Sequence, residues 1–216
     1  PQEPAQWLHI AVSGILVHAV YLGGVFVAIK HGLPAGVTAL VVGMQPLLTA
    51  IGAGWLLGEA VSGRQWAGLA LGFAGVGLVV SGKFGDGAAL GPMLIPALVA
   101  LLGITAGTLY QKRFCARFDL RTGSVIQFVP TAIVTAIVIA WFEEFHIEWT
   151  PDFIFALGWL VLVLSLAAIS LLNLLIRRGS AVNVASLFYL TPISTAVIAW
   201  AVFGEKLTLT ATAGML

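Results

Sequence analysis

Long apolar segments separated by short polar ones dominate the hydrophobic pattern of this 216-residue chain. Each apolar run has about the length of roughly 20 residues that a helix needs to cross ~30 Å of hydrocarbon. Seven runs without Asp, Glu, Lys or Arg cover residues 4–29, 31–58, 65–82, 87–111, 122–142, 153–176 and 179–204. An eighth run begins at Leu207 and reaches Leu216. The pattern predicts an all-α integral membrane protein, a multi-span helical bundle with seven full spans and part of an eighth.

The composition agrees with this prediction. Hydrophobic residues make up 60% of the chain and charged residues 9%, whereas soluble proteins carry about 25% charged residues. We therefore expect the lipid bilayer as a partner. The net charge of +1 and the lack of a basic patch argue against nucleic acid. The single cysteine, Cys115, excludes an intrachain disulfide, and the four histidines are scattered, so we expect neither a metal ion nor a cofactor.

Local signals mark where several helices begin. Residues 62–65, Ser-Gly-Arg-Gln, form a capping box, in which the side chains of the first and last residues satisfy each other's backbone donors. Ser180 follows Gly179 and is expected to cap the next helix. Pro34 suits the first turn of a helix after Gly32.

A fourteen-residue phrase occurs twice. PLLTAIGAGWLLGE runs from Pro46 to Glu59, and PISTAVIAWAVFGE runs from Pro192 to Glu205, at an offset of 146 residues. Each proline removes a backbone donor, which predicts a kink within the span. Internal repeats at this scale in a membrane protein are typical of transporters built from two halves. We divide the chain into a first repeat, residues 1–82, and a second repeat, residues 88–216.

The basic residues predict the orientation of these repeats. Lys and Arg in cytoplasmic loops usually outnumber those on the other side. Alternate loops hold seven basic residues against three: Arg64, Lys112, Arg113, Arg117, Arg121, Arg177 and Arg178 against Lys30, Lys83 and Lys206. We expect the first set inside. Five spans separate the two Gly-Glu pairs, so Glu59 is predicted inside and Glu205 outside, and the two repeats have inverted topology.

With these residues the chain resembles the ten-helix drug/metabolite transporter superfamily, specifically the group with the EamA-type repeated domain. The resemblance rests on the two prolines, the Gly-Glu pair that ends each phrase, and the glycine-rich helix from Trp66 that follows the first pair. Residues 8–82 look like family helices three to five, and residues 88–216 look like helices six to ten. The simplest expectation is a fragment that lacks two helices at the front and most of the last one; the alternative is a natural eight-span protein.

The resemblance implies a secondary transporter of the cell inner membrane that exports a small metabolite, such as an amino acid, by alternating access. No G-x-x-x-x-G-K-[ST] motif for ATP occurs, so an ion or substrate gradient would supply the energy. A non-transporting scaffold or subunit, a lipid-carrier flippase of the same fold and an intramembrane enzyme stay as alternatives, although the chain lacks the clustered acidic, histidine or cysteine residues that an enzyme needs. Gly68 and Gly72 form a small-residue face that allows close packing within the bundle or in a homodimer.

Polar residues within the spans are the candidate substrate contacts, because polar groups in hydrocarbon are costly unless they are paired or face a water-filled path. The predicted set is His18, Tyr21, Gln45, Thr49, Tyr110, Gln127, Asn173, Tyr189 and Thr191. His18 is either a proton-coupling site or a neutral side chain hydrogen-bonded between helices.

Four motif residues are predicted to act through structure. Pro46 and Pro192 should bend their helices toward a common point near the midplane, which Gln45, Thr191, Tyr189 and His18 would line. Glu59 and Glu205 should lie at opposite faces, and each should accept backbone donors at the start of the helix that follows it.

Overall fold

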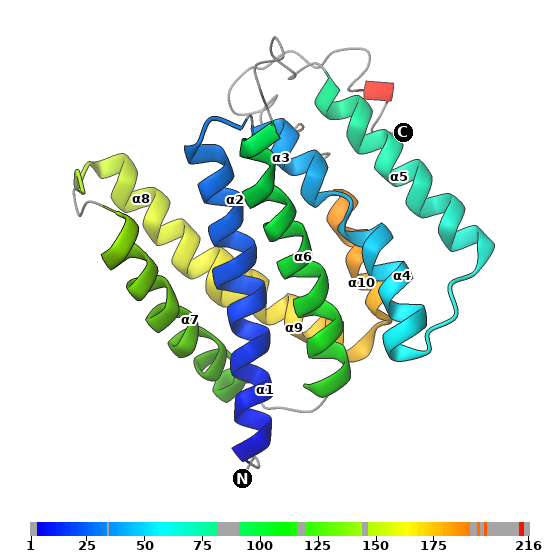
Figure 1. Cartoon of the computed structure of the whole chain (residues 1–216), viewed down its shortest axis with the longest axis horizontal. Coiled ribbons are helices and arrows are strands. Elements are labelled where there is room, and N and C mark those ends of the chain that lie inside the picture. Colours follow the sequence, from blue (N-terminus) through cyan, green and yellow to red (C-terminus); the bar gives the residue numbers. More distant parts are fainter. Residues whose placement is uncertain are drawn as a thin grey trace.

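The protein is helical in the parts that the computed structural model describes, which are residues 4–33, 35–81, 91–115, 120–143, 147–190, 194, 197 and 212–213 (Figure 1). The described helices include two π-helical segments, η1 and η2, and a 3-10 turn, η3. In chain order they are α1 (Pro4–Gly14), η1 (Ile15–Val20), α2 (Tyr21–Lys30), α3 (Ala35–Val42), α4 (Gln45–Leu57), α5 (Gly63–Ser81), α6 (Gly91–Phe114), α7 (Leu120–Phe142), α8 (Pro151–Trp159), η2 (Leu160–Ala168), α9 (Ile169–Arg178), α10 (Ala181–Ser186) and η3 (Leu187–Tyr189).

Five helical stretches in these described ranges are long and apolar enough to cross a membrane. They are Ala5–Lys30, Val37–Leu57, Leu94–Phe114, Thr122–Phe142 and Pro151–Arg178, and they confirm five of the seven predicted spans. The predicted span 65–82 also forms a helix, α5, but it is not among the five, since Arg64 and Gln65 in its first turn lower its mean hydropathy. The predicted span 179–204 begins as α10 and continues outside the described residues.

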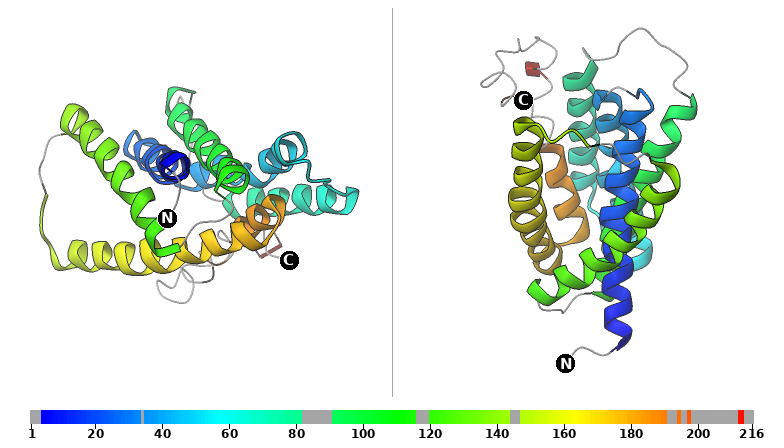
Figure 2. Two further views of the ribbon diagram at one scale, coloured as in Figure 1. Left: turned by 90° about the horizontal axis from the view of Figure 1, so that it is seen from below. Right: turned by 90° about the vertical axis from the view of Figure 1, so that its left-hand side faces the viewer.

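Helix α6 lies at the centre of the described bundle. It packs against the continuous rod formed by α1, η1 and α2 on one side and against α3 and α4 on another (Figures 1 and 2). Helix α7 covers a further side of the rod, and α9 reaches both α6 and α7. By contrast, α8 and η2 contain no buried residue. The buried interior of the described part is therefore built around α6.

Close backbone contacts between these helices depend on glycine. A Cβ atom at Gly14 of α1 would lie 2.6 Å from the Cα atom of Gln127 on α7. A Cβ atom at Gly103 of α6 would lie 2.7 Å from a methyl group of Val20 on η1. Small residues let helix backbones approach closely in membranes, where packing rather than the hydrophobic effect holds helices together.

The predicted kink before Pro46 is confirmed. Helix α3 ends at Val42, and α4 begins at Gln45 with Pro46 in its first turn, so the turn at Gly43 and Met44 divides one membrane span into two helices. The missing amide hydrogen of a proline is tolerated in a first turn, because that donor has no partner within the helix. Pro192, the corresponding residue of the second copy, lies outside the described residues.

Both predicted caps are also confirmed. The backbone N–H of Ser62 donates to Oε1 of Gln65 at 2.9 Å, and the N–H of Gln65 donates back to Oγ of Ser62 at 3.3 Å. The hydroxyl of Ser180 accepts from the N–H of Asn183 at 3.1 Å and caps α10. Pro34 lies outside the described residues.

Glu59 has the structural role that we predicted, but the predicted partner is wrong. Its carboxylate does not cap α5, the helix that follows; Oε2 and Oε1 accept the N–H of Ala181, the first residue of α10, at 3.1 and 3.3 Å. The capping box of Ser62 and Gln65 already serves the start of α5. Glu59 therefore joins the α4–α5 turn to α10, across the predicted division between the two repeats. Glu205 lies outside the described residues.

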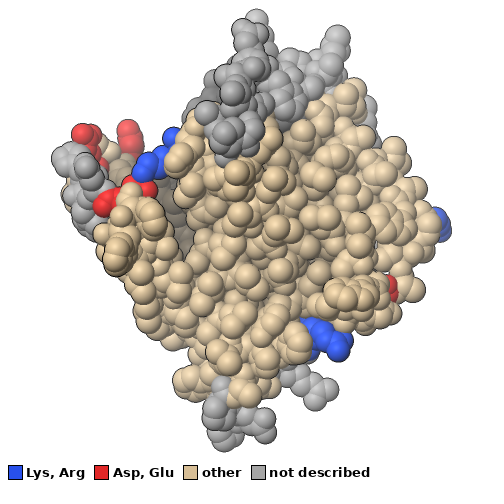
Figure 3. Space-filling view, in the orientation of Figure 1, with Lys and Arg blue, Asp and Glu red and all other residues tan. Residues whose placement is uncertain are grey.

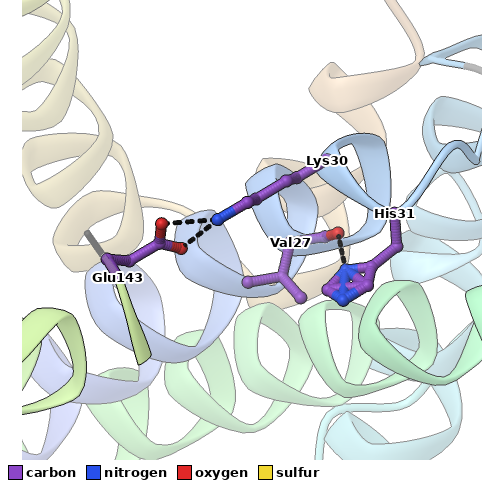
Figure 4. A network of polar contacts seen from close by, with 4 residues as sticks. All are labelled: Val27, Lys30, His31 and Glu143. Carbon is purple, nitrogen blue, oxygen red and sulfur yellow. Dashed lines mark hydrogen bonds and ion pairs between the residues drawn. The ribbon is translucent and has the colours of Figure 1, made fainter. Parts of the chain in front are cut away.

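Charged groups lie near the ends of the described bundle. On the face shown in Figure 3 they appear toward the upper left and the lower right, with uncharged surface between. At one end, Nζ of Lys30 on α2 lies 2.5 Å from Oε2 of Glu143, which follows α7 (Figure 4). At the other end, Lys112 donates to the carbonyls of Ile176 and Gly179 near the end of α9. We call this second end, with Arg64, Lys112, Arg113, Arg177 and Arg178, the basic end; it is the end predicted to be cytoplasmic.

Candidate functional site

Five buried side-chain atoms lack a hydrogen-bond partner among the described residues. They are Nε2 of His18, Oε1 of Gln45, Oγ1 of Thr49, Oγ1 of Thr105 and the hydroxyl oxygen of Tyr189, and we call these residues the inner polar set. All five are at most 9% exposed. A buried polar group without a partner costs about 1–3 kcal/mol. Such groups in a membrane bundle usually mark the path of a substrate or ion, so they define the candidate site.

Two members of the set lie where α4 meets α6. Gln45 begins α4, and Thr49 follows it one helical turn later. The amide Nε2 of Gln45 donates to Oγ1 of Thr108 on α6 at 3.5 Å, which leaves Oε1 of Gln45 unpartnered. Thr105 lies one turn before Thr108 on the same helix. Gln45, Thr49, Thr105 and Thr108 are all buried on α4 and α6, two helices that pack together, and we call them the polar seam.

His18 lies on the opposite side of α6, in the π-helical segment η1. Its ring stacks on that of Phe128 from α7, with 4.7 Å between the ring centroids. π-Helical segments are rare and often occur at functional sites. The sequence left two interpretations of His18, one of which requires a hydrogen bond from the ring to a neighbouring helix. Among the described residues, Nε2 of His18 makes no such bond. Proton coupling stays a prediction.

Tyr189 lies in η3 and packs on α5. A Cβ atom at Gly72 would lie 2.5 Å from Cδ2 of the Tyr189 ring, so Gly72 of the predicted small-residue face serves packing within the chain. The ring belongs to an apolar cluster with Ala50 and Ala53 of α4. Ala50 directly follows Thr49, and Ala53 lies one helical turn beyond Thr49. Tyr189 thus flanks the α4 side of the polar seam, while its hydroxyl group lacks a partner.

Gln127 and Asn173, both predicted substrate contacts, lie together in a closed ring of three amide side chains. Gln111 donates to Asn173 at 2.8 Å, Asn173 donates to Gln127 at 3.1 Å, and Gln127 donates to Gln111 at 3.3 Å. Gln127 also donates to the Ser13 hydroxyl at 3.1 Å. All four residues are at most 2% exposed. We call this set the amide ring; it joins α1, α6, α7 and α9.

The amide ring has a structural character that the sequence pattern did not predict. Gln111 was not among the candidates, because it lies beside Lys112 where the apolar run ends. A spacing argument could have found it: Gln111 follows Thr108 by three residues and Thr105 by six, on the face of α6 that the structure buries.

The other predicted residues lie elsewhere. Tyr110 bonds to Nδ1 of His9 at 2.6 Å, and its ring packs against Phe114 near the basic end. Tyr21 is partly buried in the first turn of α2. Thr191 lies outside the described residues. The structure therefore places Gln45 and Thr49 together and Tyr189 beside them, with His18 across α6.

A cavity of about 450 Å³ adjoins this site between α7 and the η2–α9 rod. Apolar side chains and three hydroxyl groups line it: Ser124, Val125, Phe128, Val129, Leu166, Ser165 and Ser170. Phe128 has one ring that both lines the cavity and stacks on His18.

Relatives of the chain are named as transporters or as an efflux pump. An uncharacterized transporter of Bacillus subtilis (strain 168), YvbV, is 31% identical over 221 residues, which cover 97% of this chain and 68% of that protein. YedA of Escherichia coli (strain K12), an uncharacterized inner membrane transporter, is 29% identical and covers 93% of this chain and 64% of its own length. A probable amino-acid metabolite efflux pump of the same strain is 25% identical, over 90% of this chain and 68% of the pump.

The fold is also found in a crystal structure. That protein is 21% identical, and the superposition gives a TM-score of 0.81 over 99% of this chain and 74% of the other. The chain thus spans about two thirds of the length of its curated relatives. The EamA-like transporter family matches residues 1–81 and 91–216, nearly the whole chain. With its long apolar helices, the chain is a multi-pass membrane protein that belongs to the EamA-like transporter family.

Proposed function

We propose that the complete protein is a secondary transporter that exports a small amphipathic metabolite, an amino acid or a related compound, across the inner membrane by alternating access. The observation that carries the proposal is the inner polar set, five unpartnered polar atoms within a bundle of transporter fold. The names of the relatives support it: one is an inner membrane transporter and another a probable amino-acid metabolite efflux pump.

The chemistry of the set suits such a substrate. Oε1 of Gln45 accepts a hydrogen bond, and the hydroxyl groups of Thr49, Thr105 and Tyr189 donate or accept. The ring of Tyr189 offers apolar surface beside the groups on α4, and the ring of Phe128 offers apolar surface beside His18. A molecule with a polar head and an apolar side chain would satisfy both kinds of contact. Binding would then recover the free energy that the unpartnered atoms cost in the empty site.

Flux in proteoliposomes that hold the purified full-length protein tests this proposal. We expect saturable uptake of at least one labelled amino acid or amino-acid derivative from a panel. Gln45→Leu removes an acceptor from the site and should lower kcat/KM about tenfold, the equivalent of one good hydrogen bond. His18→Leu and Tyr189→Leu should also impair flux without loss of expression.

The matched control is Ile51→Leu, on the same helix as Gln45 but 60% exposed. It should leave flux unchanged, as should a change at Thr212. Absence of flux for every compound of the panel would refute the proposed substrate class. Wild-type flux in all three site variants would place the substrate elsewhere.

A further inference from the structure

The carboxylate of Glu59 fixes a contact between the two repeats at the basic end. It accepts the backbone N–H of Ala181 with both oxygens, at 3.1 and 3.3 Å. Ala181 begins α10, where the unpartnered N–H groups and the helix dipole favour a negative charge. The hydroxyl of Ser180 caps the same helix from within its own repeat. Helix α10 therefore has one cap from each half of the protein.

Gly58, the other residue of the Gly-Glu pair, determines where this carboxylate lies. Gly58 has φ of +67°, a left-handed conformation that ends α4 and that glycine adopts without steric cost. The next N–H, that of Glu59, donates to the carbonyl of Ala53 at 3.1 Å and closes the end of the helix. The pair thus works as a unit, in which the glycine turns the chain and the glutamate reaches α10.

Two further bonds cross between the repeats at the same end. Nε2 of Gln65 donates to Oδ1 of Asn183 at 3.2 Å. The guanidinium group of Arg113, at the end of α6, donates to the carbonyl of Leu56 at 2.6 Å. Among the described residues, the hydrogen bonds from segment 56–65 to α6 or α10 each use a side chain, and Leu56, Leu57 and Val61 also pack against the apolar cluster that contains Ala181 and Val182. We call the bonds of Glu59 and Gln65 to α10 the latch.

We propose that the latch is a conformational device: it holds the basic end closed in this structure and breaks when the transporter opens its site to that face. This inference rests on the proposed alternating access, because rocking of one repeat against the other must part the α4–α5 turn from α10. Asn183 and Arg113 lie at the surface, and Gln65 and Glu59 are half-buried, so water can replace the broken bonds. Helix α10 would stay capped by Ser180 after the latch opens.

The amide ring does not suit such a movement. Its residues are almost completely buried, and three of its four helices, α6, α7 and α9, belong to the second repeat. Opening it would leave several amides unpartnered in hydrocarbon. The three amide–amide bonds hold α6, α7 and α9 together, and the bond from Gln127 to Ser13 keeps α1 against them, while the latch releases the α4–α5 turn. The second Gly-Glu pair lies outside the described residues, and the inference rests on Glu59.

The test measures access to α10 in the purified full-length protein, in liposomes and with Cys115 replaced by Ser. A cysteine reporter in place of Val182, which is 3% exposed beside Ala181, is labelled by an impermeant maleimide from the side of the basic end. We expect Glu59→Ala to raise the labelling rate about tenfold, the size expected for loss of a charge-assisted bond. Glu59→Gln keeps one acceptor and should raise it less.

A second reporter separates gating from loss of stability. A cysteine in place of Ala28, fully buried near the opposite end, should keep its labelling rate in Glu59→Ala. Equal increases at both reporters would show general loosening and overturn the proposal, as would an unchanged rate at position 182. Transport by the full-length protein is measured separately. If the protein transports substrate but Glu59→Ala leaves the labelling rate at position 182 unchanged, the latch alone is rejected. If the protein transports no substrate, the proposed transport function is rejected.

Discussion

Replacement of Gln127 by Leu tests whether the amide ring holds α1, α6, α7 and α9 together. The side chain of Gln127 makes three hydrogen bonds, to Ser13, Gln111 and Asn173. Hydrogen bonds between membrane helices average about 0.6 kcal/mol, with a maximum near 1.7 kcal/mol. Loss of all three therefore predicts a decrease of about 2 kcal/mol in the free energy of unfolding.

The assay is reversible unfolding of the full-length protein in mixed micelles, followed by the loss of helical circular dichroism. The matched control is Val125→Leu on the same helix, which is 60% exposed and should change stability by less than about 0.5 kcal/mol. In Gln127→Leu, the amides of Gln111 and Asn173 each lose a hydrogen-bond partner. A triple variant with Leu at all three positions removes these two amides as well. It should cost less than the sum of its single changes, because no member is left without a partner. A Gln127→Leu variant as stable as the control, or additive single changes, would refute this reasoning.

Three smaller predictions concern packing and charge. Gly14→Ala should lower the free energy of unfolding by about 1–3 kcal/mol, since its methyl group would meet the backbone of α7, whereas Gly23→Ala has nothing within 4 Å and should be neutral. Gly72→Ala should cost less in a Tyr189→Ala background, because the two side chains compete for one space; equal costs in a double-mutant cycle would contradict this. Glu143→Gln should change stability by less than about 1 kcal/mol, because its ion pair is 40–57% exposed; a larger loss in thermal unfolding would show an undetected role.

Much of the fold could be predicted from the sequence, because hydrocarbon thickness sets the length of an apolar run. The runs around His18, Thr49, Thr105 and Gln127 all became long helices. Pro46 predicted the break between α3 and α4 through its missing N–H. The π-helical segments η1 and η2 were not predicted, because no residue pattern in the chain distinguishes them from the α-helix on either side. The inverted topology and the orientation stay predictions.

The site was harder to predict, because position along the chain does not tell which face of a helix is buried or what it meets. Gln127 and Asn173 are polar residues within apolar runs, as substrate contacts would be. Their amide groups instead form hydrogen bonds to side chains that lie 16 to 114 residues away in the sequence. Glu59 likewise finds its partner 122 residues later, at α10. Gln45 was recognised because a proline follows it, and its unpartnered oxygen agrees with the prediction without testing it.

Substrate counterflow tests the central claim of alternating access most directly. Proteoliposomes with the full-length protein would be loaded with unlabelled substrate and diluted into a trace of the labelled compound. An alternating-access transporter exchanges one molecule for another through a single site, so the account predicts that label accumulates transiently above its equilibrium level inside. Label that rises to equilibrium without any overshoot, although the compound permeates through the protein, would contradict the account and indicate a channel.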